Sequence, residues 1–165
     1  MILRTAPPVC LLISLARFLT GALGFNRSYV GMVIQGDENR SFSVFRHVRS
    51  NRSTDGENGA VLLVRFRFRS LPDCINRVVS LVPMLLITGF PGFRAKMYGV
   101  CQADKFWMGM YEWKSMLALE NYKQSFVLKM MNRRAATGSV SYRVLPKMRL
   151  MEFVEENLIE RGGTR

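Results

Sequence analysis

The chain has 165 residues and a mass of 18.9 kDa, which leaves room for one domain of ordinary size and a terminal extension. Its composition, 48% hydrophobic and 22% charged, excludes a wholly disordered or fibrous chain. Lysine and arginine outnumber the acidic residues by 24 to 12, so the protein should attract polyanions, anionic membranes or acidic ligands. Most of the excess lies between residues 59 and 146, where thirteen basic and four acidic residues give a charge of +9.

The cysteines and the histidine do not indicate a metal site or a disulfide. Cys10, Cys74 and Cys101 contain no closely spaced pair, so we expect free thiols. His47 lies in a stretch that resembles a loop and has no set of Cys, His or acidic neighbours to complete a zinc site. No Gly-rich nucleotide-binding loop is present either. We therefore expect neither a metal nor a cofactor.

Residues 1–25 form an apolar leader. The run 9–25 contains a single charge, Arg17, and is short for a membrane span. A basic residue ahead of the run and small residues before Phe25 resemble a secretory signal with cleavage after Gly24. An amphipathic helix that lies on a membrane or docks on the domain fits the same residues.

Residues 26–58 are rich in Arg, Ser, Asn and Gly, and we interpret them as a linker or targeting stretch. An apolar leader followed by such a stretch also resembles an organelle transit peptide. If the leader is functional, the protein is exported, sent to an organelle or held at a membrane. Otherwise it is expected in the cytoplasm.

From residue 60 onward, strand and helix periods alternate. Arg65 and Arg67 alternate with apolar side chains, as in a strand with one buried face. Ser70 and Ser115 are suitable N-caps for two helices, and Pro83 should kink the first helix. The predicted elements are a strand at 60–68, a helix at 70–88, strands at 94–101 and 107–113, a helix at 115–134, a strand at 139–145 and a short helical tail within 148–165.

This βαββαβ order predicts the α+β class. We expect a ferredoxin-like domain over residues 59–147, with a four-stranded antiparallel sheet and two helices on one face, preceded by an N-terminal extension. The phase of the strand at 107–113 is ambiguous. A small sheet with apolar groups on its open side usually needs a partner. The residues predicted on that open face are Arg65, Arg67, Arg94, Lys96, Tyr98 and Arg143.

Several short segments of this region occur in the order and spacing of a known family. They are the strand Leu62 to Ser70, the turn Pro91-Gly92-Phe93 with Lys96 three residues on, Gly109-Met110-Tyr111, and Ala118 followed by Tyr122. Together they resemble the YdhR-type monooxygenases of the dimeric α+β barrel superfamily, which also contains the antibiotic-biosynthesis monooxygenases. The resemblance covers roughly residues 60 to 146.

The resemblance implies a homodimer in which two open sheet faces meet, with a mostly apolar pocket between sheet and helices. The ligand would be a small hydrophobic or aromatic molecule. The cofactor-free oxygenases of that superfamily act on electron-rich aromatic substrates, which supply the electrons to oxygen themselves. No catalytic motif of the family can be placed on this chain, and residues 60–146 contain no histidine to act as general base. The catalytic residues are therefore unknown at this stage.

The candidate pocket residues are aromatic and basic. The arginines are expected to orient an anionic or phenolate group, and the aromatic residues to form the walls. The alternative for the aromatic residues is core or interface packing, and for the arginines it is a solvated strand face. The candidates are Arg65, Arg67, Tyr98, Trp107, Tyr111, Trp113 and Tyr142.

Two other functions fit the same topology. An RNA-recognition module is also βαββαβ and basic, but Gly109 and Tyr111 match its strand motif only loosely, so nucleic acid is the less favoured partner. A non-catalytic dimerisation domain held at an anionic membrane by the leader and the basic surface is the other alternative.

Overall fold

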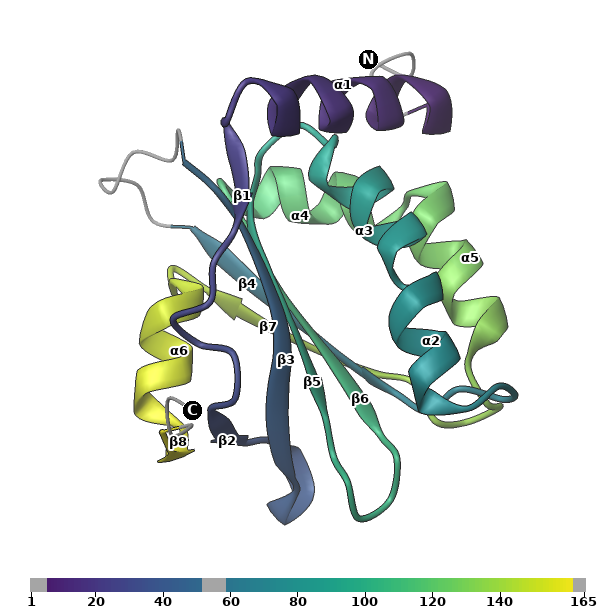
Figure 1. Cartoon of the computed structure of the whole chain (residues 1–165), viewed down its shortest axis with the longest axis vertical. Coiled ribbons are helices and arrows are strands. Elements are labelled where there is room, and N and C mark those ends of the chain that lie inside the picture. The colour runs from purple at the N-terminus through teal and green to yellow at the C-terminus, as the bar shows by residue number, and fades with distance from the viewer. Residues whose placement is uncertain (1–5, 52–58, 162–165) are drawn as a thin grey trace.

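The computed structural model describes residues 6–51 and 59–161. Figure 1 shows a twisted sheet with most of the helices on one side and a C-terminal helix on the other. The elements are α1 (Pro7–Leu19), β1 (Leu23–Phe25), β2 (Val33–Gln35), the short 3-10 helix η2 (Asp37–Asn39), β3 (Ser41–Ser50), β4 (Ala60–Phe66), α2 (Asp73–Val79), α3 (Leu81–Thr88), β5 (Phe93–Val100), β6 (Trp107–Trp113), α4 (Met116–Lys123), α5 (Phe126–Arg134), β7 (Ser141–Pro146), α6 (Leu150–Glu156) and β8 (Leu158–Glu160).

The predicted ferredoxin-like unit is confirmed. Strands β4, β5, β6 and β7 are all antiparallel to their neighbours and follow the order β7-β4-β6-β5. The helices that connect them, α2 to α5, lie on one face of the sheet (Figure 1). This is the α+β arrangement that the βαββαβ order predicts.

The prediction of four strands was too low, because the described residues form a sheet of eight strands. The long strand β3 pairs antiparallel with β5, and β1, β2 and β8 extend the sheet beyond it. Part of the stretch that we expected to be a linker or targeting segment, 33–35 and 41–50, is therefore strand. Its Arg- and Ser-rich composition obscures a period of two, in which Phe42 and Val44 are buried. The rest of the predicted linker, 52–58, lies outside the described residues.

Both predicted helices are interrupted. The first breaks at Ser80 and not at Pro83, because Pro83 occupies the first turn of α3, where its missing N–H is tolerated. Its N-cap is Pro72 and not Ser70. The second helix starts at Ser115 as predicted, but the hydroxyl of Ser125 caps a new helix, α5, by accepting a hydrogen bond from the Leu128 amide.

Each face of the sheet has its own hydrophobic core. On the helix face, side chains of β4, β5 and β6 pack against α3, α4 and α5. On the opposite face, alternate residues of the same strands pack against α6, whose Leu150, Phe153 and Val154 are buried. The face that we predicted to be open is therefore covered by α6 together with Tyr29 and Met32 of the chain between β1 and β2 (Figure 1). The predicted C-terminal helix is present and extends that core.

The N-terminal segment packs against the domain. Helix α1 lies along α3 (Figure 1), and the hydroxyls of Ser14 and Thr88 are hydrogen-bonded at 2.6 Å. Arg17 donates to the Thr88 carbonyl oxygen at 2.8 Å. A Cβ atom on Gly89 would overlap the backbone of Cys10, so the two helices approach as closely as a glycine allows. Within the described residues, no helix is long and apolar enough to cross a membrane.

Candidate functional site

Lys96 is the most unusual residue in the interior. It lies in the middle of β5, opposite Tyr111 of β6 and Val48 of β3, and its side chain is fully buried. Our prediction put Lys96 and Tyr98 on the open face with Arg94, and this was wrong. A register shift between Phe93 and Ala95 leaves Arg94 on the α6 side and turns Lys96 and Tyr98 toward the helices.

The ammonium group of Lys96 is surrounded by aromatic rings. Its Nζ lies 4.1 Å from the centroid of the Tyr98 ring and 4.4 Å from that of Tyr111. Within the described part of the chain, this Nζ makes no hydrogen bond. Burial, together with the nearby charge of Arg46, lowers the pKa of Lys96 well below its usual value. The neutral amine is therefore more populated near neutral pH than in an exposed lysine.

The tyrosines around Lys96 belong to a continuous aromatic layer. Tyr111 lies against Tyr122 of α4 with ring centroids 5.5 Å apart, and both hydroxyls point at the Met131 sulfur at 3.9 Å. Burial raises the pKa of Tyr98, Tyr111 and Tyr122, so all three stay protonated. Gly109 makes this packing possible, because a Cβ atom there would lie 2.8 Å from the Tyr111 ring.

Hydrogen bonds hold the junction between α2 and α3 against the aromatic layer. Arg46 of β3 donates to the Ser80 hydroxyl at 2.7 Å and to the Arg77 carbonyl oxygen at 2.8 Å. Its guanidinium also lies over the Tyr98 ring, 5.5 Å from the centroid. The Tyr98 hydroxyl points to the Ser80 carbonyl oxygen at 3.4 Å. The helix junction and the aromatic layer are thus tied together through one arginine.

Next to Tyr98 lies a small cavity between sheet and helices, which we call the inner cavity. Its volume is about 20 Å³, room for about one water molecule. Its lining is almost entirely apolar and comes from β4, β5, β6, α3 and α5 and the chain between them. The residues that line it are Phe66, Phe68, Ser80, Pro83, Tyr98, Trp107, Met131 and Arg134.

A larger hollow of about 280 Å³, the outer hollow, opens at the surface beside the inner cavity. Phe68 lines both spaces and therefore forms the wall between them. The Arg134 guanidinium lies 5.2 Å from the Phe68 ring centroid and donates to Asn76 of α2 at 3.4 Å. Arg67, Lys105 and Asp73 also line the hollow, and Lys105 lies 3.8 Å from the Asp73 carboxylate.

The structure brings together four of the predicted pocket residues. Tyr98, Trp107, Tyr111 and Trp113 all lie in the helix-face core, which resolves the phase of the strand at 107–113. Arg67 lines the outer hollow, whereas Arg65 is bound to Glu38 at 2.8 Å on the α6 side of the sheet. Tyr142, at the sheet edge, donates to Asn132 at 2.6 Å.

Sequence reasoning missed the burial of Lys96, because it placed this residue on the open face. It also missed Arg46 and Phe68. The sequence feature that singled out Lys96 was its position three residues after the turn Pro91-Gly92-Phe93. No local pattern identifies Arg46, which lies in the stretch that we interpreted as a linker.

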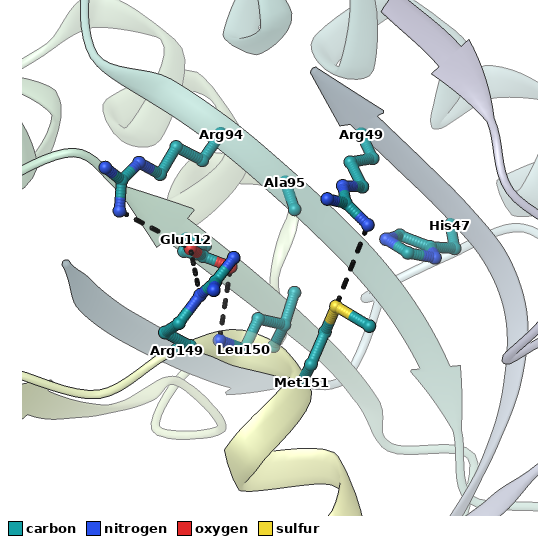
Figure 2. A pocket seen from close by; sticks show the side chains of 8 residues that line it. All are labelled: His47, Arg49, Arg94, Ala95, Glu112, Arg149, Leu150 and Met151. Carbon is teal, nitrogen blue, oxygen red and sulfur yellow. Dashed lines mark hydrogen bonds and ion pairs between the residues drawn. The ribbon is translucent and has the colours of Figure 1, made fainter. Parts of the chain in front are cut away.

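The opposite face of the sheet carries a second polar cluster, shown in Figure 2. Glu112 of β6 points toward Arg94 and Arg149, with N–O distances of 3.8 and 3.9 Å. Its carboxylate also accepts a hydrogen bond from the Leu150 amide at the start of α6. His47 lies in this cluster, on β3 and not in the predicted loop, and burial lowers its pKa to about 4. This cluster attaches α6 to the sheet.

Among the described residues, no group of three or more Cys, His, Asp and Glu side chains is arranged to hold a metal ion. Cys10, Cys74 and Cys101 form no disulfide within the residues that the structure describes.

The fold is similar to those of three solved structures. One is an uncharacterised ferredoxin-fold protein related to antibiotic biosynthesis monooxygenases from Listeria monocytogenes (TM-score 0.52, 12% identity, 80% of this chain and 86% of that one). Another is a heme-degrading enzyme from the same organism (TM-score 0.51, 14% identity, 79% and 90%). The third is a monooxygenase-like protein from Listeria innocua (TM-score 0.50, 12% identity, 81% and 84%).

These similarities confirm the predicted fold: the chain has the ferredoxin-like fold that the three structures share. No protein-family model matches the chain, and no curated protein matches its sequence. The low identities mean that the function has to be argued from the site.

Proposed function

We propose that this protein binds a small phenolic or enolic molecule between the sheet and α2, α3 and α5, and oxygenates it without a bound cofactor. The observation that carries the proposal is Lys96, a fully buried amine that makes no hydrogen bond within the described residues and faces an aromatic layer. An unpaired buried amine lowers the stability of a fold, so its presence calls for a functional reason. Residues 60–146 contain no histidine that could act as general base, and a lysine with a lowered pKa can act as one instead.

In this mechanism the neutral Lys96 amine accepts the proton of the substrate hydroxyl. The resulting anion is electron-rich, and its ring carbon forms a bond to O₂, which is reduced to the peroxide level. The peroxide takes the proton back from Lys96, and loss of water leaves a carbonyl at that carbon. For a dihydroxynaphthalene, one substrate and one O₂ become one hydroxynaphthoquinone and one water. The protonated tyrosines can donate hydrogen bonds to the developing anion.

Ligand access requires movement, because the inner cavity is far smaller than an aromatic ring system. Phe68 separates that cavity from the outer hollow, whose volume of about 280 Å³ is large enough for a bicyclic aromatic. Arg67 on the rim of the hollow would attract an anionic substrate, whereas the charge of Lys105 is offset by Asp73 at 3.8 Å. We therefore propose that the substrate enters through the outer hollow as the Phe68 ring turns aside.

The heme-degrading activity of one structural neighbour is not proposed for this chain. His47, the only histidine of the sequence, lies on the α6 face of the sheet with Glu112 and Arg49. A haem in the space between sheet and helices would therefore have no imidazole ligand from this chain.

The geometry gives no support to the RNA-binding alternative. Base stacking needs exposed rings on an open sheet face, whereas every residue of β6 is buried and its aromatic side chains face the helices. The opposite face is covered by α6.

The test is oxygen uptake by the full chain with a dihydroxynaphthalene, combined with the absorbance of the quinone product. We expect uptake by the wild type and a loss of about a hundredfold or more in Lys96→Met. The matched control is Lys129→Met, because Lys129 is exposed on α5 and should leave the rate unchanged.

Binding is measured separately by the quenching of tryptophan fluorescence. Binding without oxygen uptake would support a small-molecule site and overturn the oxygenase step. Neither binding nor uptake, or equal rates for the wild type and Lys96→Met, would overturn the assignment of Lys96 as the base.

The homodimer was expected to form through the open face of the sheet, and that face is not free in this fold. In the dimeric α+β barrel two open sheet faces meet, but here α6 packs on that face through Leu150, Phe153 and Val154. We therefore propose that any homodimer of this protein forms elsewhere. Its mass in sedimentation equilibrium, with and without α6 residues changed to polar ones, would test this.

A further inference from the structure

Helix α1 has its polar residues turned inward and its apolar residues turned outward. The buried side of α1 carries Cys10 and Ser14, and Arg17 reaches α3 to donate to the Thr88 carbonyl oxygen. The side away from the domain carries an exposed stripe at helical spacing, which we call the outer stripe. It consists of Pro8, Leu11, Leu12, Leu15, Ala16 and Leu19. A helix that only covered a core would have the opposite polarity.

The exposure of the outer stripe is large. Leu12 is 67% exposed and Leu19 is 88% exposed, so a polar side chain at either position would lose little packing within the domain. The apolar surface continues past the helix end through Phe25, which stacks on Phe18 with ring centroids 5.6 Å apart and is itself 58% exposed. A contiguous apolar surface of this kind on a folded protein marks an interaction site.

The charge of the protein indicates what covers this surface. The whole chain carries +12, and its first acidic residue is Asp37, so the N-terminal segment offers no negative charge to a basic partner. Two copies of this chain would repel each other over long range, whereas an anionic lipid surface would attract each of them. An apolar stripe combined with a basic protein is the pair of signals that gives stable attachment to a bilayer surface.

The length of α1 sets how it can lie. Thirteen residues at about 1.5 Å each make a helix of roughly 20 Å, shorter than the roughly 30 Å hydrocarbon core of a bilayer. Its bonds to Thr88 also hold it against α3 at one end of the molecule (Figure 1). The helix can therefore lie in the plane of a membrane surface without leaving the fold.

We propose that the outer stripe of α1 docks this protein on an anionic membrane surface, with its leucines buried among the lipid headgroups and acyl chains. This inference is independent of the proposed oxygenase function, because it uses no residue of the Lys96 site.

The experiment is flotation of the full chain with vesicles of phosphatidylcholine that contain phosphatidylserine, and with vesicles of phosphatidylcholine alone. We expect the wild type to float with the anionic vesicles, to float less as salt is raised, and to bind the neutral vesicles more weakly. The variant Leu12→Ser/Leu15→Ser/Leu19→Ser should lower the partition coefficient roughly a hundredfold. Circular dichroism and the melting temperature establish that the variant is folded.

The matched control is Val78→Ser, an exposed apolar residue on α2, at the other end of the helical layer from α1 (Figure 1). It should bind the vesicles as the wild type does. Wild-type protein that stays at the bottom of the gradient overturns the proposal, and so does a folded triple variant that floats as well as the wild type. A wild type that does not float but forms a dimer, with the triple variant monomeric, overturns it in favour of a second copy as the occupant.

Discussion

The Nζ atom of Lys96 lies 4.1 Å from the centroid of the Tyr98 ring, and both residues are on the helix face of the sheet. The ring stabilises the ammonium form through its negative face, whereas burial without a hydrogen bond destabilises the same form. Burial, and after it the nearby charge of Arg46, lowers the pKa of Lys96. The fold therefore carries an energetic penalty at the position where we propose that the chemistry occurs.

This penalty predicts a pH-dependent stability difference between the wild type and Lys96→Met. In the unfolded chain Lys96 has its usual pKa of 10.5, and in the folded protein the value is lower. Between these two values the unfolded state binds more protons, so the penalty is fully present below the folded pKa and disappears as the pH rises to 10.5. We expect Lys96→Met to be more stable than the wild type at pH 7, by a margin that falls by about 1.4 kcal/mol per pH unit inside that window.

Urea unfolding of both proteins at several pH values measures this margin. Lys129→Met serves as the control, because an exposed lysine should give a small difference that does not change with pH. A Lys96→Met protein that is less stable than the wild type at pH 7 would show that Lys96 is paired in solution.

The approach of Tyr111 to Gly109 gives a second prediction. Gly109→Ala places a methyl group 2.8 Å from the Tyr111 ring, so the ring must leave its position beside Lys96. We expect a loss of about 1–3 kcal/mol in the free energy of unfolding and weaker binding of a dihydroxynaphthalene. The control is Gly24→Ala, where the new methyl would meet only Asn51, at 3.5 Å. An unchanged affinity in Gly109→Ala would remove Tyr111 from the binding site.

The wall between the inner cavity and the outer hollow gives a third prediction. Phe68→Ala joins the two spaces, so the association rate of a dihydroxynaphthalene should rise, measured by stopped-flow fluorescence. Stability should fall by roughly 2 kcal/mol, because the Phe68 ring packs edge-on against Phe66 and Trp107. Phe126→Ala, at an exposed position on α5, is the control. An association rate that does not change would mean that the ligand enters by another route.

The sequence was sufficient to predict the elements in which apolar and polar residues alternate regularly within the element itself. Strand 107–113 was predicted at its observed bounds, and the aromatic residues that it contributes lie together as expected. The predictions that were wrong concern features that depend on contacts with other parts of the chain. The register shift that turns Lys96 inward depends on how β5 pairs with β6, and no pattern within β5 reveals it.

The same reasoning explains the missing strand. In β3, Phe42 and Val44 are buried on the α6 side of the sheet and Val48 on the helix side, because a register shift between Val44 and Arg46 interrupts the alternation. The polar residues Arg46 and His47 follow this shift. Both polar residues are accommodated by contacts with distant parts of the chain, Arg46 by the α2–α3 junction and His47 by the face that α6 covers. Local composition therefore suggested a linker where the sheet supplies one of its longest strands.

The contact between α1 and α3 gives a fourth prediction. Gly89→Ala would force α1 away from α3, because the new methyl overlaps the backbone of Cys10. Gly89 has φ of −81°, so the substitution introduces no backbone strain of its own and the effect is steric. We expect a loss of about 1–3 kcal/mol and faster proteolysis of the N-terminal segment. Equal proteolysis in wild type and variant would show that α1 is not docked on α3 in solution.

The attachment of α6 depends on Glu112, and this gives the last prediction. Glu112→Gln keeps an acceptor for the Leu150 amide but removes the charge that faces Arg94 and Arg149. Because Arg94 and Glu112 are both nearly buried, we expect a loss of roughly 3 kcal/mol and faster hydrogen exchange in α6. Glu38→Gln, at an exposed ion pair with Arg65, should have a much smaller effect. If exchange in α6 is the same in Glu112→Gln and the wild type, the hydrophobic contacts of Phe153 and Val154 are sufficient to hold the helix, and the ion pairs contribute little.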